Sequence, residues 1–269
     1  MTTIESGKIA FPKGWQVPKF DGVEFKKKRT KYAVCVFLIN EGEKIKKQLR
    51  AMATFSDVAD IILADGGSTD GALSNELMQA TGVRALLTKR QTGKLGTQMR
   101  MAFAWALNEG YEGLVVVDGN NKDDVSAIPR FVKELESGVD HVQGSRFVPG
   151  GRAVNTPVER LIGLKILHAP LVSLAARHRY TDTTNGFRAY SRKLLLDPRV
   201  AVFRDIFTGY EVHYYLAIRA ARLGFKVSEI PVTRAYPKGQ PAPTKISPIK
   251  GNLGVIKILV KAARHKYNP

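Results

Sequence analysis

The sequence has a single cysteine, Cys35, among its 269 residues. A disulfide framework within the chain is therefore excluded, and a reducing compartment is the natural expectation. Because Cys35 lies inside the apolar run YAVCVFLI, we expect it to be a small residue of the core.

Long hydrophobic runs are also lacking. A membrane-spanning helix needs about 20 consecutive apolar residues, but the segment LIGLKILHAPLVSLAA is interrupted by Lys165, His168 and Pro170, and LGVIKILVKAA is short and carries two lysines. The N-terminus has no basic region followed by an apolar stretch, so it does not resemble a secretory signal. We therefore expect a cytoplasmic protein that associates with a membrane only peripherally.

Acidic residues are scarce relative to basic ones, with 24 Asp and Glu against 42 Lys and Arg and a formal net charge of +18. Such a charge attracts anionic partners, which include nucleic acid, phosphorylated ligands and anionic membrane surfaces. Nucleic-acid-binding surfaces interleave aromatic and basic residues, whereas the basic residues here flank aliphatic ones. We expect no specific nucleic-acid partner and keep nucleic-acid binding as a remote alternative.

Apolar runs alternate with amphipathic segments from residue 31 onward. The runs at 32–39, 60–64, 83–87 and 113–117 are typical of strands that are covered on both faces. The segments between them have apolar residues at helical spacing, most clearly at 97–109. This alternation predicts an α/β fold with a mostly parallel, Rossmann-like sheet, helices on both faces, and ligands at the carboxyl ends of the strands.

The chain divides into three parts by composition. Residues 1–30 are irregular and basic, and we expect an N-terminal arm there. The main domain is expected at 31–245, with a regular half at about 31–143 and a less regular, Gly-rich and Arg-rich half at about 144–245. An amphipathic basic tail follows at 246–269.

Polar clusters follow three of the expected strands. Asn40 and Glu41 follow the first, residues 65–70 follow the second, and residues 118–124 follow the fourth. Because the carboxyl ends of parallel strands share one edge of a sheet, these clusters are predicted to form one site. The glycines of the second cluster, ADGGSTDG, allow backbone N–H groups to approach a ligand closely.

The third cluster, DGNNKDD, offers oxygen ligands from Asp118, Asn120, Asp123 and Asp124. A hard divalent cation held by one or two carboxylates and by ligand phosphates uses such a cluster. The alternative is a strand-to-helix loop in which an aspartate caps the next helix.

Seven segments in this order resemble the family 2 glycosyltransferases of GT-A fold: FLINEGE, LADGGSTDG, TGKLG, VVVDGNNKDD, QGSRFVPGG, DTTNGFRAYSR and GFKVSEIPV. The resemblance covers about residues 31–245 and is greatest to the dolichol-phosphate mannosyltransferase and polyprenyl-phosphate glycosyltransferase branch. It implies transfer of a sugar from a nucleotide-sugar donor to a polyprenyl-phosphate or lipid-linked acceptor at an anionic membrane surface, with Mg²⁺ or Mn²⁺ as the expected cofactor.

The resemblance also implies donor-side residues. Asp65 would hold the base, Lys94 would face the phosphates, and Asp118 would lie in the metal-binding Asp-X-Asp position, with Asn120 as the second metal ligand. With the strand-end clusters, the expected nucleotide-sugar set is Asn40, Glu41, Asp65, Gly67, Ser68, Lys94, Asp118, Gly119 and Asn120. Because the family usually has an aspartate where this chain has Asn120, metal affinity is expected to be weaker, or Asp123 and Asp124 contribute more.

On the acceptor side, the resemblance implies that Arg146 of GSR and Arg188 of GFR line the phosphates. Arg160 takes the position of an arginine that contacts the acceptor phosphate, although the serine usual four residues later is Leu164 here. Arg188, Lys94 and a metal at Asp118 would neutralise the leaving diphosphate of an oxocarbenium-like transition state.

The acceptor decides whether a general base is needed. A lipid phosphate is already ionised, whereas the hydroxyl of a soluble or polymeric sugar requires a base. Asp182 and Glu211 are the candidates for that base. The alternatives are that Asp182 caps a turn and that Glu211 interacts with the dipole of the helix it opens.

Basic and aliphatic residues interleave over residues 157–179. This pattern is typical of a surface that lies on anionic lipid, and equally of a core-facing helix with a solvated basic face. Pro170 is expected to kink or divide the helix. The tail IKGNLGVIKILVKAARHK repeats the pattern and leaves the same two interpretations.

Overall fold

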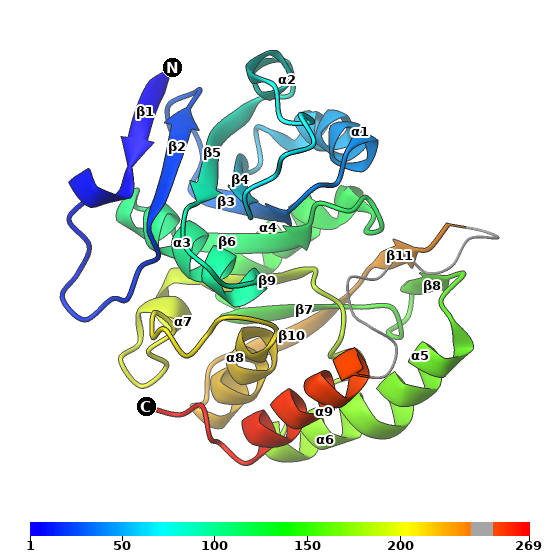
Figure 1. Cartoon of the computed structure of the whole chain (residues 1–269). Coiled ribbons are helices and arrows are strands. Elements are labelled where there is room, and N and C mark those ends of the chain that lie inside the picture. Colours follow the sequence, from blue (N-terminus) through cyan, green and yellow to red (C-terminus); the bar gives the residue numbers. More distant parts are fainter. Residues whose placement is uncertain (238–249) are drawn as a thin grey trace.

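The computed structural model describes residues 1–237 and 250–269, so the expected boundary between residues 245 and 246 lies outside the described residues. Within these ranges one sheet has nine strands in the order β1-β2-β5-β4-β3-β6-β9-β7-β10 (Figure 1). The strands are β1 (Thr2–Glu5), β2 (Phe20–Glu24), β3 (Tyr32–Leu38), β4 (Asp60–Asp65), β5 (Val83–Lys89), β6 (Gly113–Asp118), β7 (His141–Ser145), β9 (Arg188–Ser191) and β10 (Val227–Pro231). Strands β8 (Arg152–Val154) and β11 (Thr233–Ala235) form a separate parallel pair.

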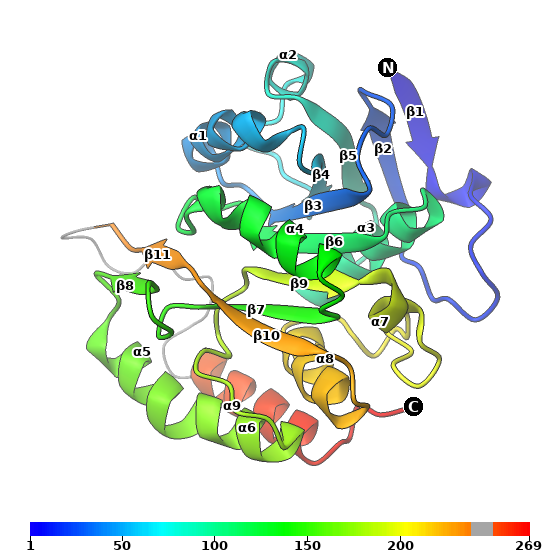
Figure 2. The ribbon, with the colours of Figure 1, turned by 180° about the vertical axis from the view of Figure 1, so that it is seen from behind.

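The centre of the sheet is parallel, as the alternating pattern predicts. Strands β5, β4, β3 and β6 run parallel to one another, while β9 is antiparallel to both β6 and β7. Helices cover both faces, as the two opposite views in Figures 1 and 2 show. The helices are α1 (Glu43–Met52), α2 (Asn75–Ala80), α3 (Leu95–Asn108), α4 (Ile128–Glu136), α5 (Val158–Gly163), α6 (Ala169–Ala176), α7 (Arg192–Leu196), α8 (Glu211–Arg222) and α9 (Lys250–Ala263).

The side chains of the central strands alternate between two cores. Cys35 and Phe37 of β3 pack with residues of α3, α7 and α8 on one face. Val34 and Val36 pack with residues of α1, α2 and α4 on the other face. The whole of β3 is buried, which explains why its sequence is a continuous apolar run and confirms Cys35 as a core residue.

The N-terminal segment differs from the expected irregular arm. Strand β2 pairs antiparallel with the outer strand β5, and β1 pairs with β2, so residues 1–30 extend the main sheet. Trp15, between these strands, stacks on Phe203 with ring centroids 3.8 Å apart. Burial of this stack and pairing of the β5 edge stabilise a segment whose own sequence has little strand character.

The segment 157–179 is helical almost throughout. Helix α5 passes into a π-helical turn, Leu164–His168, and then into α6, with Pro170 in the first turn of α6. The expected break at Pro170 is replaced by this π turn, whose wider hydrogen-bonding pattern accommodates the missing N–H. No helix in the described parts of the chain is long and apolar enough to cross a membrane.

Two buried histidines predict a pH-dependent stability. His141 is fully buried and His213 is 7% exposed, and burial, followed by the charge of Arg188, lowers the pKa of both well below 6.5. Below pH 6.5 the unfolded chain takes up protons that the native state does not, so stability is lost as the pH falls below this value. We expect the free energy of unfolding to fall between pH 7 and pH 5 by up to about 1.4 kcal/mol per pH unit for each histidine.

Urea unfolding at several pH values measures this slope. His141→Gln removes one of the two titrating groups, so its slope over the same pH range should be shallower than that of the wild type. An equal slope in both proteins would contradict the assignment of the pH dependence to His141.

Candidate functional site

The ends of three central strands bring the expected polar clusters together. In the register of the sheet, Leu38 of β3 lies beside Asp65 of β4, and Phe37 lies beside Asp118 of β6. The loops that follow these strands therefore start from one sheet edge, as the sequence predicts.

Hydrogen bonds join the first two loops. The side-chain oxygen of Asn40 accepts from the Thr69 amide at 2.8 Å, and the Asn40 amide donates to Ser68 Oγ at 2.9 Å. The Gly42 amide donates to an oxygen of Asp70 at 2.9 Å. The glycine-rich loop after β4 is thus held against the loop after β3.

Two buried glutamines, which the sequence analysis did not single out, hold the strand ends. Gln98 of α3 donates to the carbonyl oxygens of Leu38 at 2.9 Å and Ala64 at 2.8 Å. Gln48 of α1 donates to the Asp118 carbonyl at 2.9 Å and accepts from the Asn121 amide at 2.7 Å. A polar residue on the buried face of an amphipathic helix is the signal by which each could have been found.

The Asp65 carboxylate is directed at its own loop. It is 2% exposed and accepts from the amides of Gly67 and Ser68 and from Ser68 Oγ, the last at 2.6 Å. Gly67 has a φ of +97°, which favours glycine at this position. Asp65 therefore shapes the loop in this structure, and its contact with a base stays a prediction.

Lys94 stands exposed at the start of α3, beside the loop that leads into α8. Its amide donates to the Thr208 carbonyl at 2.8 Å, and a Cβ at Gly96 would lie 2.8 Å from the Gly209 amide nitrogen. Glu211 Oε1 in turn accepts from the amides of Thr208 and Gly209. Glu211 therefore fixes this loop, and the same oxygen is not free to act as a base.

Asp118, the carboxylate at the start of the β6 loop that is expected to bind a metal, has a side chain that is 30% exposed. Its Oδ2 accepts from Asn120 Nδ2 at 3.3 Å, and a Cβ at Gly186 would lie 3.3 Å from its Oδ1. A Cβ at Gly119 would lie 2.8 Å from the Cβ of Leu38, so glycine is required there. Residues 185–187, here called the NGF loop, thus lie against Asp118, whose carboxylate nevertheless stays partly exposed.

Arg234 of β11 is a site residue that sequence reasoning missed. Its Nη2 lies 3.1 Å from Asp118 Oδ2, and its Nη1 donates to Asp123 Oδ2. Asp123 has a fully buried side chain, and burial raises its pKa to about 6 in spite of the neighbouring Arg234. The two expected acidic ligands are therefore bridged by one guanidinium in this structure.

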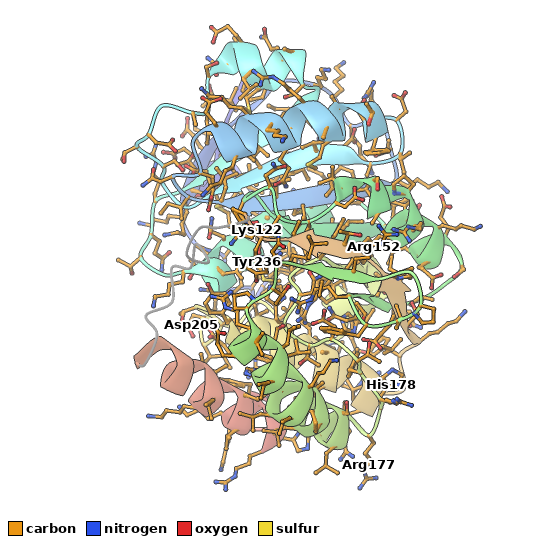
Figure 3. All side chains as sticks on the ribbon, turned by 90° about the vertical axis from the view of Figure 1, so that its right-hand side faces the viewer. Lys122, Arg152, Arg177, His178, Asp205 and Tyr236 are labelled. Carbon is orange, nitrogen blue, oxygen red and sulfur yellow. The ribbon has the colours of Figure 1, made fainter. Side chains whose placement is uncertain are left out.

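A basic cluster surrounds Tyr236, two residues after Arg234. Arg160 of α5 donates to the Tyr236 hydroxyl at 3.2 Å, and Lys122 Nζ lies 5.2 Å from the ring centroid (Figure 3). Burial alone would raise the pKa of Tyr236, but Arg234 and Arg160 together lower it below its usual value. Arg160, which is predicted to bind an acceptor phosphate, thus lies beside the β6 loop, close to the positive charges of Lys122 and Arg234.

Arg146 and Asp182 form a buried ion pair, which differs from both of their predicted roles. Arg146 Nε lies 2.7 Å from Asp182 Oδ2, with side chains 5% and 0% exposed. The other Asp182 oxygen accepts from Arg146 and from the amides of Thr184 and Asn185. Both carboxylate oxygens are occupied, so the structure does not present Asp182 as a base or Arg146 as a free phosphate ligand.

Arg188 also differs from its predicted role. Its side chain is among the largest that are fully buried, and it donates to the carbonyl oxygens of Asn185, His213 and Thr183 at 2.8 to 2.9 Å. All of these acceptors belong to the backbone. Arg188 therefore joins the NGF loop to α8 rather than facing a diphosphate.

The donor set for a metal is small. Among the described residues, no group of three or more His, Cys, Asp or Glu could hold a metal ion. Asp118 and Asn120 nevertheless offer a carboxylate and an amide oxygen at one loop, and Mg²⁺ or Mn²⁺ is commonly held by one or two carboxylates together with substrate phosphates. The residues fit a metal that binds with the help of a diphosphate.

The sequence is similar to those of a polyprenol monophosphomannose synthase and an undecaprenyl-phosphate mannosyltransferase. The chain is 33% identical over 176 residues to the polyprenol monophosphomannose synthase of Mycolicibacterium smegmatis, covering 64% of this chain and 65% of that protein. It is 29% identical over 198 residues to the undecaprenyl-phosphate mannosyltransferase of Micrococcus luteus, covering 72% and 79%. The chain thus spans just under two thirds of the first relative, and no family model matches it.

The fold resembles that of a solved glycosyltransferase. The glucosyl-3-phosphoglycerate synthase of Mycobacterium tuberculosis, solved with Mn²⁺, uridine diphosphate and phosphoglyceric acid, aligns with a TM-score of 0.61. The alignment covers 87% of this chain and 78% of that one at 20% identity, which supports the shared fold. The chain thus has the α/β fold of GT-A glycosyltransferases, and its sequence is similar to those of polyprenyl-phosphate mannosyltransferases.

Proposed function

We propose that the protein transfers a sugar from a nucleotide-sugar to a polyprenyl phosphate at a membrane surface. The observation that carries this proposal is the position of Asp118 next to the basic cluster of Lys122, Arg160 and Arg234. One side of this arrangement suits the cation-bound diphosphate of a donor, and the other suits the phosphate of an acceptor.

On the donor side, the loops after β3 and β4 would bind the nucleoside and the loop after β6 would meet the diphosphate. Asp118 and Asn120 would hold Mg²⁺ or Mn²⁺, which when bound supplies charge neutralisation for the departing diphosphate. Lys94 is exposed at the N-terminus of α3, where the helix dipole also favours an anion. These groups would stabilise negative charge as the bond to the sugar breaks.

The class of acceptor is inferred from the carboxylates that are already held by other protein groups. A sugar hydroxyl needs a general base, but Asp182 is paired with Arg146 and Glu211 binds the Thr208–Gly209 loop. A phosphate oxygen is already ionised and needs none. The arrangement therefore favours a lipid phosphate over a sugar hydroxyl, and Arg160 would bind that phosphate.

The helical segment from α5 to α6 is the proposed membrane contact. One side of α6 packs against α8 and α9 through a buried apolar cluster. Along the whole segment from α5 to α6, large apolar side chains are exposed, from 37% for Leu167 to 79% for Leu174. We call them the apolar ridge, and they are Val158, Ile162, Ile166, Leu167 and Leu174. Figures 2 and 3 show this segment along the outer edge of the molecule, with Arg177 at its end.

Basic residues accompany this apolar ridge. Lys165, Arg177 and Arg179 are partly or fully exposed in the same segment, and Arg160 at its start reaches the Tyr236 hydroxyl. An interfacial helix combines apolar burial in the acyl boundary with attraction to anionic headgroups. A lipid held at this surface would have its phosphate near the basic cluster.

A double variant tests the membrane contact. We expect Ile162→Asp/Ile166→Asp to lower binding to vesicles that contain anionic lipid by about tenfold or more, because two apolar side chains that would enter the lipid are lost and negative charge is added. Vesicle co-sedimentation at fixed salt measures this binding. The control is Leu196→Asp on α7, where the parent side chain is 39% exposed and far from the ridge in sequence. Equal binding by the ridge variant and the control would contradict the proposed contact.

Calorimetric titration with UDP, GDP, dTDP and CDP, each with and without Mn²⁺, tests the donor side. The salt concentration must suppress nonspecific attraction to a chain of charge +18. Preferential binding of one nucleotide with Mn²⁺ supports the proposal and identifies the base of the donor. Absence of binding by all four would overturn it.

A further inference from the structure

We propose that Arg234 is a built-in counter-ion that keeps divalent cations away from Asp118 until a nucleoside diphosphate is bound. This inference rests on the proposed function, because it takes a nucleoside diphosphate as the ligand. It goes further in assigning an order: the metal joins the site with the nucleotide, and not before it.

Arg234 is held over the β6 loop by its backbone as well as by its side chain. The Ala235 amide donates to the Lys122 carbonyl at 2.8 Å, the Asp124 amide donates to the Thr233 carbonyl at 2.9 Å, and Arg234 and Asp123 form a β-bridge. Its guanidinium, only 10% exposed, then reaches Asp118 with one nitrogen and Asp123 with another. A single side chain thus engages both acidic groups of the loop.

The local charge leaves little attraction for a free cation. The negative charges of Asp118 and Asp123 are opposed by Arg234 and by Lys122, which lies over the neighbouring Tyr236 ring. A hard divalent cation needs anionic oxygens that are not already paired. Without a ligand, the site offers a cation chiefly Asp118 Oδ1, because Asp123 Oδ1 is buried and the amide oxygen of Asn120 already accepts from the Lys122 amide at 3.3 Å.

A nucleoside diphosphate changes this balance. Its oxygens carry negative charge that can pair with Arg234 and coordinate the cation at the same time. Asp118 would then be released from the guanidinium and become available to the metal. Nucleotide and metal binding should therefore be strongly and reciprocally coupled.

Electron paramagnetic resonance of Mn²⁺ tests this order without any turnover. Bound Mn²⁺ is measured for the wild type with Mn²⁺ alone and with each of UDP and GDP, with protein-free mixtures subtracted. We expect weak binding of Mn²⁺ alone and at least about tenfold tighter binding with the nucleotide that the site prefers. The variant Arg234→Met should bind Mn²⁺ alone at least about tenfold more tightly than the wild type, because one positive charge next to Asp118 is removed.

The test needs one control variant and one alternative to Arg234→Met. Arg152 is an exposed arginine of β8 that lies opposite Thr233, the residue before Arg234. The variant Arg152→Met therefore also removes one positive charge near β11, and it should bind Mn²⁺ as the wild type does. If Arg234→Met does not fold because Asp123 is left buried without its partner, Asp123→Asn/Arg234→Met removes both charges and tests the same point.

Tight binding of Mn²⁺ alone by the wild type, equal to that of the Arg234 variants, would overturn the inference. Failure of the proposed function has a different signature, in which no nucleotide binds with or without Mn²⁺ even though the Arg234 variants bind Mn²⁺ more tightly than the wild type.

Discussion

Replacing Asp118 by asparagine is expected to lower sugar transfer by about 10³-fold or more, because the negative charge that holds the cation against the leaving diphosphate is lost. The change is nearly isosteric and the side chain is partly exposed, so the fold should remain intact. Transfer is measured with labelled nucleotide-sugar, and the fold is checked by urea unfolding.

The matched control for Asp118 is Asp124→Asn in the same loop. Asp124 is exposed and accepts from the Ser126 amide at 3.0 Å as the cap of a short helix, a role that asparagine also fills. Its turnover should stay near that of the wild type. Full turnover by Asp118→Asn would show that the metal and diphosphate are not bound at this loop.

Replacing Arg146 by methionine is expected to destabilise the protein by about 3–5 kcal/mol, because Asp182 would be left as a buried carboxylate without its partner. The pair is almost fully enclosed, so solvent screening does not reduce this effect. Urea or thermal unfolding measures it.

Two comparisons separate this structural role from a role in acceptor binding. Arg146→Met/Asp182→Leu removes both charges and should recover part of the lost stability. Arg152→Met, on an exposed strand nearby in sequence, should change stability by no more than about 0.5 kcal/mol. Unchanged stability of Arg146→Met together with a raised KM for the acceptor would instead support the phosphate contact that the sequence predicts.

The central fold and the donor edge are the parts that the sequence predicts well. A strand covered on both faces has to be apolar, so β3, β4 and β6 are visible as runs, and the loops that follow parallel strands must share an edge. This reasoning alone predicts that Asn40, Asp65 and Asp118 lie at one edge of the sheet, and the register of the strands agrees. Their binding roles stay predictions.

The acceptor side was less predictable because a sequence motif does not show which of its side chains are buried. Arg146 and Arg188 have the residue type that a phosphate needs, yet both are buried and engaged by Asp182 or by backbone carbonyls. Arg234 is the reverse case, since it lies 116 residues from Asp118 in sequence and no local pattern connects the two. Only the path of β10 and β11 brings it to the β6 loop.

The N-terminal segment was missed for a related reason. Strands β1 and β2 have four and five residues, and β2 contains Gly22, which weakens the strand pattern. A Cβ at Gly22 would lie 2.5 Å from the carbonyl oxygen of Leu86, so glycine allows close pairing with β5. The free edge of β5 stabilises this strand, and that edge is not visible in the local sequence.

The most direct measurement of the central claim is transfer of labelled sugar from UDP-linked and GDP-linked donors to undecaprenyl phosphate in anionic vesicles, with Mg²⁺ or Mn²⁺. A soluble oligosaccharide serves as the competing acceptor. We predict a labelled lipid product from one donor that depends on Asp118 and Arg160, and no transfer to the oligosaccharide. Transfer to the oligosaccharide alone, or a lipid product that persists when Asp118 and Arg160 are both replaced, would contradict the account.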